Sequence, residues 1–132
     1  MALQLATIAL PDDMQWSDEF SWLPTAQQVE IASSGALIVE ESAQLAGRPI
    51  TLVGSDSNPG FAWASRATIG ALYALASIPR VGPLTLLLQD GRSLNVRFRF
   101  NDGAAVEAKP IRFMAPQVDA DQYLLTLRLM QV

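Results

Sequence analysis

The chain is 132 residues long; half of its residues are hydrophobic, only 17% are charged, and the formal net charge is -4. It has no cysteine and no histidine, which excludes disulfides, thiolate nucleophiles, cysteine-containing zinc sites and catalysis by an imidazole. The negative charge opposes a phosphate backbone, so we do not expect binding to nucleic acid.

The length fits one domain, residues 1–132, that should bury roughly two-thirds of the surface of its unfolded chain. An ordinary soluble protein has about 25% charged residues. The smaller charged fraction found here indicates surface that is buried between subunits. A small, rather apolar monomer is the alternative that composition leaves open.

Nothing in the sequence predicts export or membrane insertion. Residues 1–10 have no basic residue ahead of their apolar part and run directly into Pro11, unlike a signal peptide. The longest candidate for a membrane span, Ala67–Ile78, lies between Arg66 and Arg80 and is far shorter than the ~20 residues that a bilayer requires. We therefore expect a soluble protein.

The first elements expected are extended. Leu3–Leu10 is predicted to be a strand, and Met14–Trp22 alternates large aromatic with small or polar residues, as in a second extended segment. In that segment Trp16, Phe20 and Trp22 would lie on one side. Aromatic side chains at this spacing either fill the core or form a contact surface.

A hairpin follows, with Gln28–Ala32 and Ala36–Ser42 flanking the turn at Ser33-Ser34-Gly35. Ile50–Val53 is the next predicted strand. The polar sequence Asp56–Gly60 is a strong turn signal, and residues 61–63 are expected to form a short strand after it.

One helix is predicted, from Arg66 to about Ser77, with Ser65 as its N-cap and Pro79 ending it. Its core face is predicted to carry Ile69, Leu72, Tyr73 and Ala76. Gly70 lies inside this helix. It is either required by close packing against a sheet or tolerated at a cost of ~1 kcal/mol.

The clearest hairpin joins Leu84–Gln89 to Arg92–Asn101. A three-residue loop with Gly91 in a left-handed conformation would pair Leu86 with Leu94 and collect the apolar side chains on one face. The face with Thr85, Asn95, Arg97 and Arg99 is then largely polar.

Two strands complete the prediction, Ala105–Met114 and Tyr123–Val132. The last has leucines at 125, 127 and 129 on one face, whereas Leu124, Met130 and Val132 lie on the other. Both faces therefore need cover, from a helix and a sheet or from another subunit. The predicted fold class is α+β, mainly antiparallel β, sandwich or barrel-like, with one helix at about 66–77.

Paired acids do not predict an active site. Neighbouring residues of a strand point to opposite faces, so Asp12-Asp13, Asp18-Glu19 and Glu40-Glu41 cannot converge on one reacting atom. Residues 56–58 resemble a calcium loop only faintly, since Ala67 stands where the bidentate glutamate belongs. We expect no catalytic residue, no metal and no cofactor.

The candidate residues are those of a subunit interface. Arg97 and Arg99 are predicted either to face solvent or to pair with acids such as Asp18 or Glu19 of an adjoining copy. The full set combines aromatic, charged and apolar side chains: Trp16, Asp18, Glu19, Phe20, Trp22, Arg97, Arg99 and Met130.

Four segments resemble, in the same order, a small family of tail proteins from long-tailed bacteriophages and prophages. They are residues 10–56 with QWSDEFSW and GALIVEESAQLAGRPITLVG, residues 64–75 (ASRATIGALYAL), residues 86–100 (LLLQDGRSLNVRFRF) and residues 123–132 (YLLTLRLMQV). The family is similar to components of the distal tail, tail tip or baseplate hub, in which small β-rich domains with one helix form closed rings.

The resemblance implies a structural virion protein that is made in the host cytoplasm and resides in the virion tail. Its partners would be copies of itself in a ring and other tail proteins of the tube, hub or tip, while genomic DNA only passes through. Ring closure would remove exposed strand edges. The alternative is a carbohydrate-binding module at the tail tip that stacks sugars on Trp16, Trp22 and Trp63.

Overall fold

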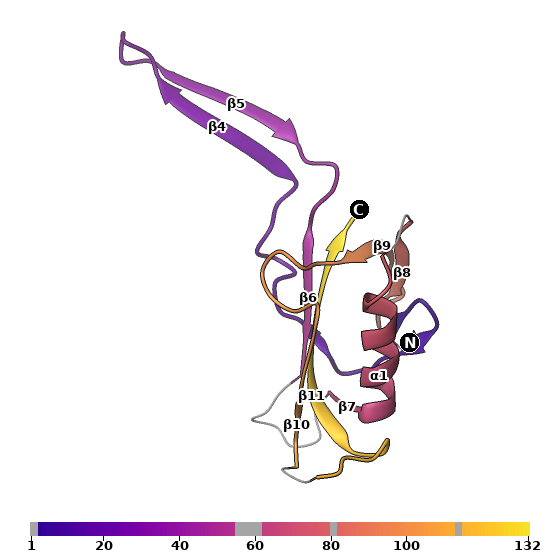
Figure 1. The fold of residues 1–132 in the computed structure, drawn as a ribbon. Helices are drawn as coiled ribbons and strands as arrows, with labels where there is room; N and C mark the ends of the chain where they lie inside the picture. The colour runs from indigo at the N-terminus through magenta and orange to yellow at the C-terminus, as the bar shows by residue number, and fades with distance from the viewer. Residues whose placement is uncertain (1–2, 55–61, 80–81, 113–114) are drawn as a thin grey trace.

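The computed structural model describes residues 3–54, 62–79, 82–112 and 115–132. Within these ranges the chain is mainly antiparallel β-sheet with one α-helix (Figure 1), which confirms the predicted fold class. The predicted turn at Asp56–Gly60 and the first residue of the strand expected after it lie outside the described residues.

The long C-terminal strand β11 (Gln122–Gln131) is the centre of the main sheet. On one edge it pairs with β10 (Val106–Pro110) and then β9 (Ser93–Phe98). On its other edge it pairs with β7 (Trp63–Ser65) and then β6 (Pro49–Val53). A strand with partners along both edges has its backbone groups bonded within the sheet, and the side chains alternate between a fully buried and a half-buried face.

The sheet extends outward from this centre. Beyond β9 lie β8 (Leu84–Leu87), β1 (Gln4–Leu5) and β2 (Ile8–Ala9), and beyond β6 lies β3 (Gln15–Trp16). The two ends of the sheet approach each other, because the side chain of Gln89 donates to the carbonyl oxygens of residues 12 and 14.

The predicted continuous strand at Leu3–Leu10 is wrong. The chain turns at Ala6, whose φ is 52°, and places Leu5 opposite Ile8. In a straight strand Leu10 would face away from Leu3 and Leu5, whereas the turn directs all of them into one core. Burial of three leucines therefore outweighs the cost of a left-handed alanine.

The hairpin β8–β9 has the predicted register, with Leu86 opposite Leu94 and Leu84 opposite Val96. Gly91 has a φ of 93°, the left-handed conformation that the three-residue loop requires. The loop is closed by the Leu88 N–H, which donates to the Arg92 carbonyl at 2.8 Å.

Helix α1 (Arg66–Ala76) begins after Ser65, whose hydroxyl accepts from the Thr68 N–H, as predicted for an N-cap. Leu72 is fully buried and packs toward the sheet, but Tyr73 is exposed, so its predicted place on the core face is wrong. A Cβ on Gly70 would meet nothing within 4 Å. Close packing therefore does not explain this glycine. Of the two explanations predicted, a glycine that the helix tolerates at some cost is the one that fits.

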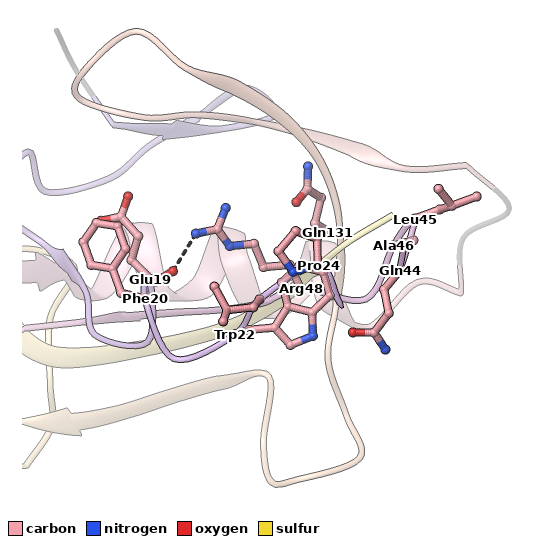
Figure 2. Close-up of a pocket in the computed structure, with 10 residues that line it drawn as sticks. Glu19, Phe20, Trp22, Pro24, Gln44, Leu45, Ala46, Arg48 and Gln131 are labelled. Carbon is pink, nitrogen blue, oxygen red and sulfur yellow. Dashed lines mark hydrogen bonds between the residues drawn. The ribbon is translucent and has the colours of Figure 1, made fainter. Parts of the chain in front are cut away.

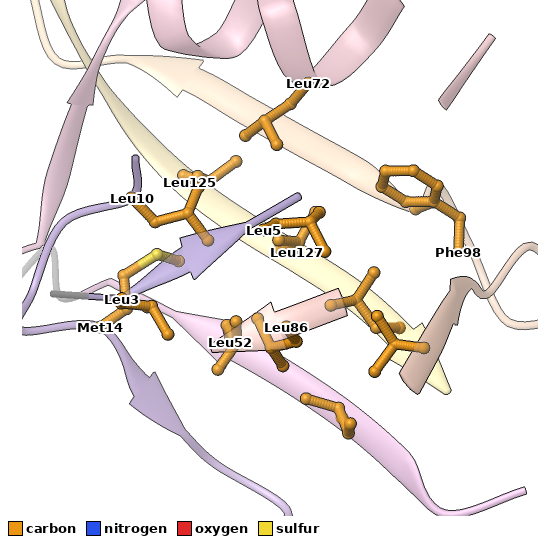
Figure 3. Close-up of a cluster of buried hydrophobic side chains, with 14 of the residues drawn as sticks. Leu3, Leu5, Leu10, Met14, Leu52, Leu72, Leu86, Phe98, Leu125 and Leu127 are labelled. Carbon is orange, nitrogen blue, oxygen red and sulfur yellow. The ribbon is translucent and has the colours of Figure 1, made fainter. Parts of the chain in front are cut away.

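The core lies where α1, the N-terminal hairpin and the inner face of the sheet meet (Figure 3). It is mostly leucine, and β11 supplies the side chains at its centre: Leu125, Leu127 and Leu129. This confirms the predicted buried face of the last strand. Polar atoms are nearly absent from this layer, since Arg99 is the one buried charged residue among those described.

A second sheet stands apart from this body. Strands β4 (Thr25–Ile31) and β5 (Leu37–Ala43) form the hairpin predicted around Gly35, and they pair only with each other. The hairpin, here called the arm, projects away from the rest of the molecule (Figure 1).

Candidate interaction surface

The arm is exposed along its whole length. Seven residue pairs, from Thr25 with Ala43 to Ile31 with Leu37, hold it together, but every residue of β5 and nearly every residue of β4 faces solvent. An isolated two-stranded hairpin is at best marginally stable in water. The arm therefore lacks the cover that such a hairpin needs.

The two faces of the arm differ in chemistry. Toward its tip one face carries the cross-strand pairs Val29–Val39 and Ile31–Leu37, here called the tip patch. These four side chains remain 51%, 47%, 76% and 65% exposed, respectively. On the same face Glu41 follows toward the base, where its carboxylate accepts from the Gln27 side chain at 2.5 Å.

The opposite face of the arm is acidic. It carries Glu30 and Glu40, with Ile38 as its large apolar member. No lysine or arginine lies between residues 23 and 47. The arm thus combines an apolar tip patch with a purely negative set of charges.

At the arm's base the chain forms a pocket of about 400 Å³ from the segments that leave and rejoin the body (Figure 2). Its apolar rim includes Phe20, which is 88% exposed, and Leu45, which is 96% exposed. Arg48 lies within it and donates to the Glu19 carbonyl oxygen. Exposed apolar side chains around a cation are typical of a surface that another protein covers.

Trp16 stands beneath two arginines. The guanidinium carbon of Arg48 lies 4.6 Å from the centre of the Trp16 ring, and that of Arg92 lies 5.6 Å from it. Glu19 bonds to Arg92 at 2.7 Å, a hydrogen bond that raises the pKa of Arg92. Asp90 also pairs with this guanidinium, and the Arg92 backbone N–H, donating to its carboxylate, lowers the pKa of Asp90.

A polar network joins the β3–β4 segment to the sheet. The carboxylate of Asp18 accepts from both the N–H and the hydroxyl of Thr51 at 2.9 Å. The same hydroxyl accepts from Arg99, which also bonds to Asp102 and to the Leu129 carbonyl oxygen. These bonds satisfy a guanidinium that is only 8% exposed.

This network corrects the prediction for residues 14–22. Only Gln15 and Trp16 are strand, and the chain turns from Ser17 onward. Because Asp18 bonds back to Thr51, Trp16, Phe20 and Trp22 do not share one side of a strand, as the alternation had indicated. Phe20 is exposed, while the other two are partly covered.

Trp16 has Arg48 and Arg92 over its ring, and the other predicted interface residues separate into two groups. The first has charged groups that are bonded within the chain: Asp18, Glu19 and Arg99. The second group lines surface hollows: Phe20 and Trp22 lie at the arm's base, while Arg97 and Met130 lie in a second, separate hollow. Intrachain bonds thus already account for Arg99, for which a solvated face or a contact with an adjoining copy had been expected.

The second hollow, here called the groove, has a volume of about 480 Å³ and lies between the end of α1 and the ends of β9 and β11. Ile78 and Phe100, both more than half exposed, form its walls. The Phe98 and Phe100 rings are 6.4 Å apart at an interplanar angle of 39°. Arg97 adds a positive charge to this mostly apolar lining.

The acidic residues of the described ranges do not gather into one cluster. Glu40 and Glu41 lie opposite Gln28 and Gln27, respectively, so the two carboxylates point to opposite faces of the arm, as expected. No set of three or more carboxylates suited to a metal occurs among the described residues. None of the described helical residues forms a helix long and apolar enough to cross a membrane.

Comparison of the chain with models of protein families, with curated proteins and with solved structures gives no significant match. A function for this chain must therefore be inferred from its own residues.

Proposed function

We propose that the protein is a structural subunit that acts by assembling with copies of itself and with other proteins. In line with its sequence resemblance, the assembly is a ring in the tail of a bacteriophage, in the distal tail, tail tip or baseplate hub. It joins the tail tube to the tip and leaves a passage for DNA.

The arm is the single observation that carries this proposal. Fully burying an aliphatic side chain stabilises a protein by about 1.5–3 kcal/mol. The four side chains of the tip patch keep roughly half of their surface in water, so roughly 5 kcal/mol of stabilisation is available only in a complex. A monomer that kept this hairpin exposed would also offer two unpaired strand edges for uncontrolled association.

The charge distribution supports the same proposal. The chain has a net charge of -4, and its arm is acidic throughout. A negatively charged lining would let DNA slide through a ring without binding to it, because like charges repel.

The tryptophans do not favour the carbohydrate-binding alternative. Sugar stacking needs an open aromatic face. Trp16 has arginine guanidinium groups over its ring and its indole N–H donates to the Pro49 carbonyl oxygen at 3.3 Å. Trp22 and Trp63 are also partly covered. We therefore retain assembly as the proposed function.

The test is the mass of the purified protein in solution, measured by light scattering over a range of concentrations. We expect a mass that is a multiple of the 14.3 kDa chain for the protein alone, or a complex heavier than any of the separate proteins once the neighbouring tube and tip proteins of the same phage are added. Ile31→Asp combined with Leu37→Asp should prevent this assembly. A protein that stays monomeric at all concentrations and binds none of its neighbours would contradict the proposal.

A further inference from the structure

Two of the molecule's exposed apolar surfaces have charges of opposite sign beside them. One is the tip patch of the arm, which projects from the body and has Glu41 on its face. The other is the groove, which is concave, apolar and contains a cation. We propose that the arm of one copy docks its tip patch into the groove of the next copy. This inference rests on the proposed function and names the contact that would build the ring.

Both sides of this contact are apolar. The tip patch presents aliphatic side chains in two adjacent cross-strand pairs, Val29–Val39 and Ile31–Leu37. The groove offers Ile78, Phe100 and the half-buried Met130 as apolar walls. A hairpin of seven residue pairs is about 23 Å long, so its tip can reach a neighbour while its base remains on its own body.

Charge favours the same occupant. The arm bears only negative charges, and Glu41 lies on the face of the tip patch. Arg97 lines the groove. Each copy of this chain therefore has both surfaces that the contact needs. The arm of one copy supplies an apolar surface with an adjacent carboxylate, and the groove of the next supplies an apolar hollow with a guanidinium. Complementary charges would fix the orientation of the hairpin in the hollow.

The positions of the two surfaces make the contact directional. Gln131 lines the pocket at the arm's base, and its neighbour Met130 lines the groove. Consecutive residues of a strand point to opposite faces, so the base pocket and the groove open on opposite faces of the end of β11. The arm stands clear of its own body (Figure 1). Each copy can thus give its arm on one side and receive an arm on the other.

A contact of this kind joins different patches of the two partners. Such heterologous contacts close into a ring when the rotation between copies divides a full turn, and otherwise form a filament. The exposed edges of β4 and β5 would then be held beside a neighbour's body, which removes the hazard of open strand edges.

Disulfide trapping tests the contact directly, because the chain has no cysteine of its own. Leu37→Cys and Phe100→Cys are made as two separate full-length variants; both positions are exposed, and thermal unfolding checks that each variant folds. After mixing and mild oxidation, we expect at least tenfold more covalent dimer than with a control mixture of Leu37→Cys and Tyr73→Cys. Tyr73 is exposed on α1 and does not line the groove.

A complementation experiment tests the direction. Ile31→Asp with Leu37→Asp gives an arm-defective variant, and Ile78→Asp with Phe100→Asp gives a groove-defective one. Each alone should be monomeric. A mixture should form dimers and nothing larger, since one intact arm meets one intact groove.

The outcomes separate this inference from the proposed function. A wild-type protein that assembles but gives no excess of the mixed disulfide overturns the arm-in-groove contact and leaves assembly standing. A disulfide that forms more readily in Leu37→Cys alone indicates pairing of arms with each other, which also overturns it. A wild-type protein that stays monomeric at all concentrations, alone and with the neighbouring tail proteins, overturns both.

Discussion

The body and the arm of this protein both contain strands with alternating apolar residues, but these residues are buried in the body and exposed in the arm. In β11 of the body, alternate leucines are fully buried against helix and sheet. In the arm, the alternating apolar residues of β4 and β5 are paired correctly but face water. Alternation thus determines strand and register in both regions, but only the presence of a covering layer determines burial. In the arm, no other element of the described chain supplies a covering layer.

The largest expected effect is on the free energy of unfolding, which should fall when a leucine of the body is shortened and hardly change when a leucine of the arm is. Leu127→Ala removes a fully buried side chain at the centre of the core, and leucine-to-alanine changes in cores cost about 2–5 kcal/mol. Leu37→Ala, the matched change in the arm, should alter the free energy of unfolding of the monomer by less than ~0.5 kcal/mol. Urea unfolding measured at low protein concentration gives both values. Equal losses would mean that the arm is part of the cooperative body.

For self-association the order of the two variants should be reversed, with the arm variant showing the larger loss. Leu37→Ala shortens the tip patch and is expected to weaken self-association at least tenfold, whereas folded Leu127→Ala keeps the patch intact. Light scattering across a dilution series measures this. An arm variant that assembles like the wild type would contradict a role for the tip patch.

The next largest effect concerns the polar network that fixes the base of the arm. Thr51→Val removes a hydroxyl that both accepts from Arg99 and donates to Asp18, and losing hydrogen bonds to charged groups should cost about 1–3 kcal/mol. The matched control is Thr85→Val on the exposed face of β8, which should cost little. Chemical denaturation of the two variants checks the difference; a Thr51→Val protein as stable as the control would show that the network contributes nothing.

Sequence reasoning found the pieces of this comparison but not their arrangement. It predicted the helix with its Ser65 cap, the registered hairpin around Gly91 and the buried leucines of β11, because each depends on neighbours in the chain or on simple alternation. It also predicted the hairpin around Gly35. That the hairpin would stand alone depends on which strands lie beside it, and local periodicity does not contain this information.

The failures have the same origin. The strand expected at Leu3–Leu10 breaks at Ala6 because Leu10 is buried in the core together with Leu3 and Leu5. The segment after Trp16 turns because Asp18 bonds to Thr51, which is 33 positions away in the sequence. The groove was not foreseen either, since Ile78 and Phe100 lie on different elements. One signal in the arm was available: apolar Val29 and Ile31 alternate with charged and polar residues in a segment that has no basic side chain.

A smaller effect is expected at the body's hairpin loop. Gly91 has a φ of 93°, a conformation that alanine resists, so Gly91→Ala should destabilise the protein by about 1 kcal/mol. The loop lies at the junction of β8 and β9, whose Leu84, Leu86 and Val96 are in the core, so local strain is transmitted to the whole body. Thermal unfolding measures the shift, and an unchanged melting temperature would count against the register.

The smallest effect should come from the equivalent glycine of the arm. Gly35 has a φ of 88°, and its loop has the same hydrogen bonds as the loop at Gly91: the Ala32 N–H donates to the Ala36 carbonyl, and the Gly35 N–H to the Ala32 carbonyl, both at 2.8 Å. Gly35→Ala therefore meets the same local strain of about 1 kcal/mol.

Because no core residue lies in the arm, we expect Gly35→Ala to change the free energy of global unfolding of the monomer by less than ~0.3 kcal/mol. Instead, amide hydrogen exchange in β4 and β5 should accelerate about fivefold, since a local opening reports the local free energy. A Gly35→Ala variant that melts as early as Gly91→Ala would show that arm and body unfold as one unit.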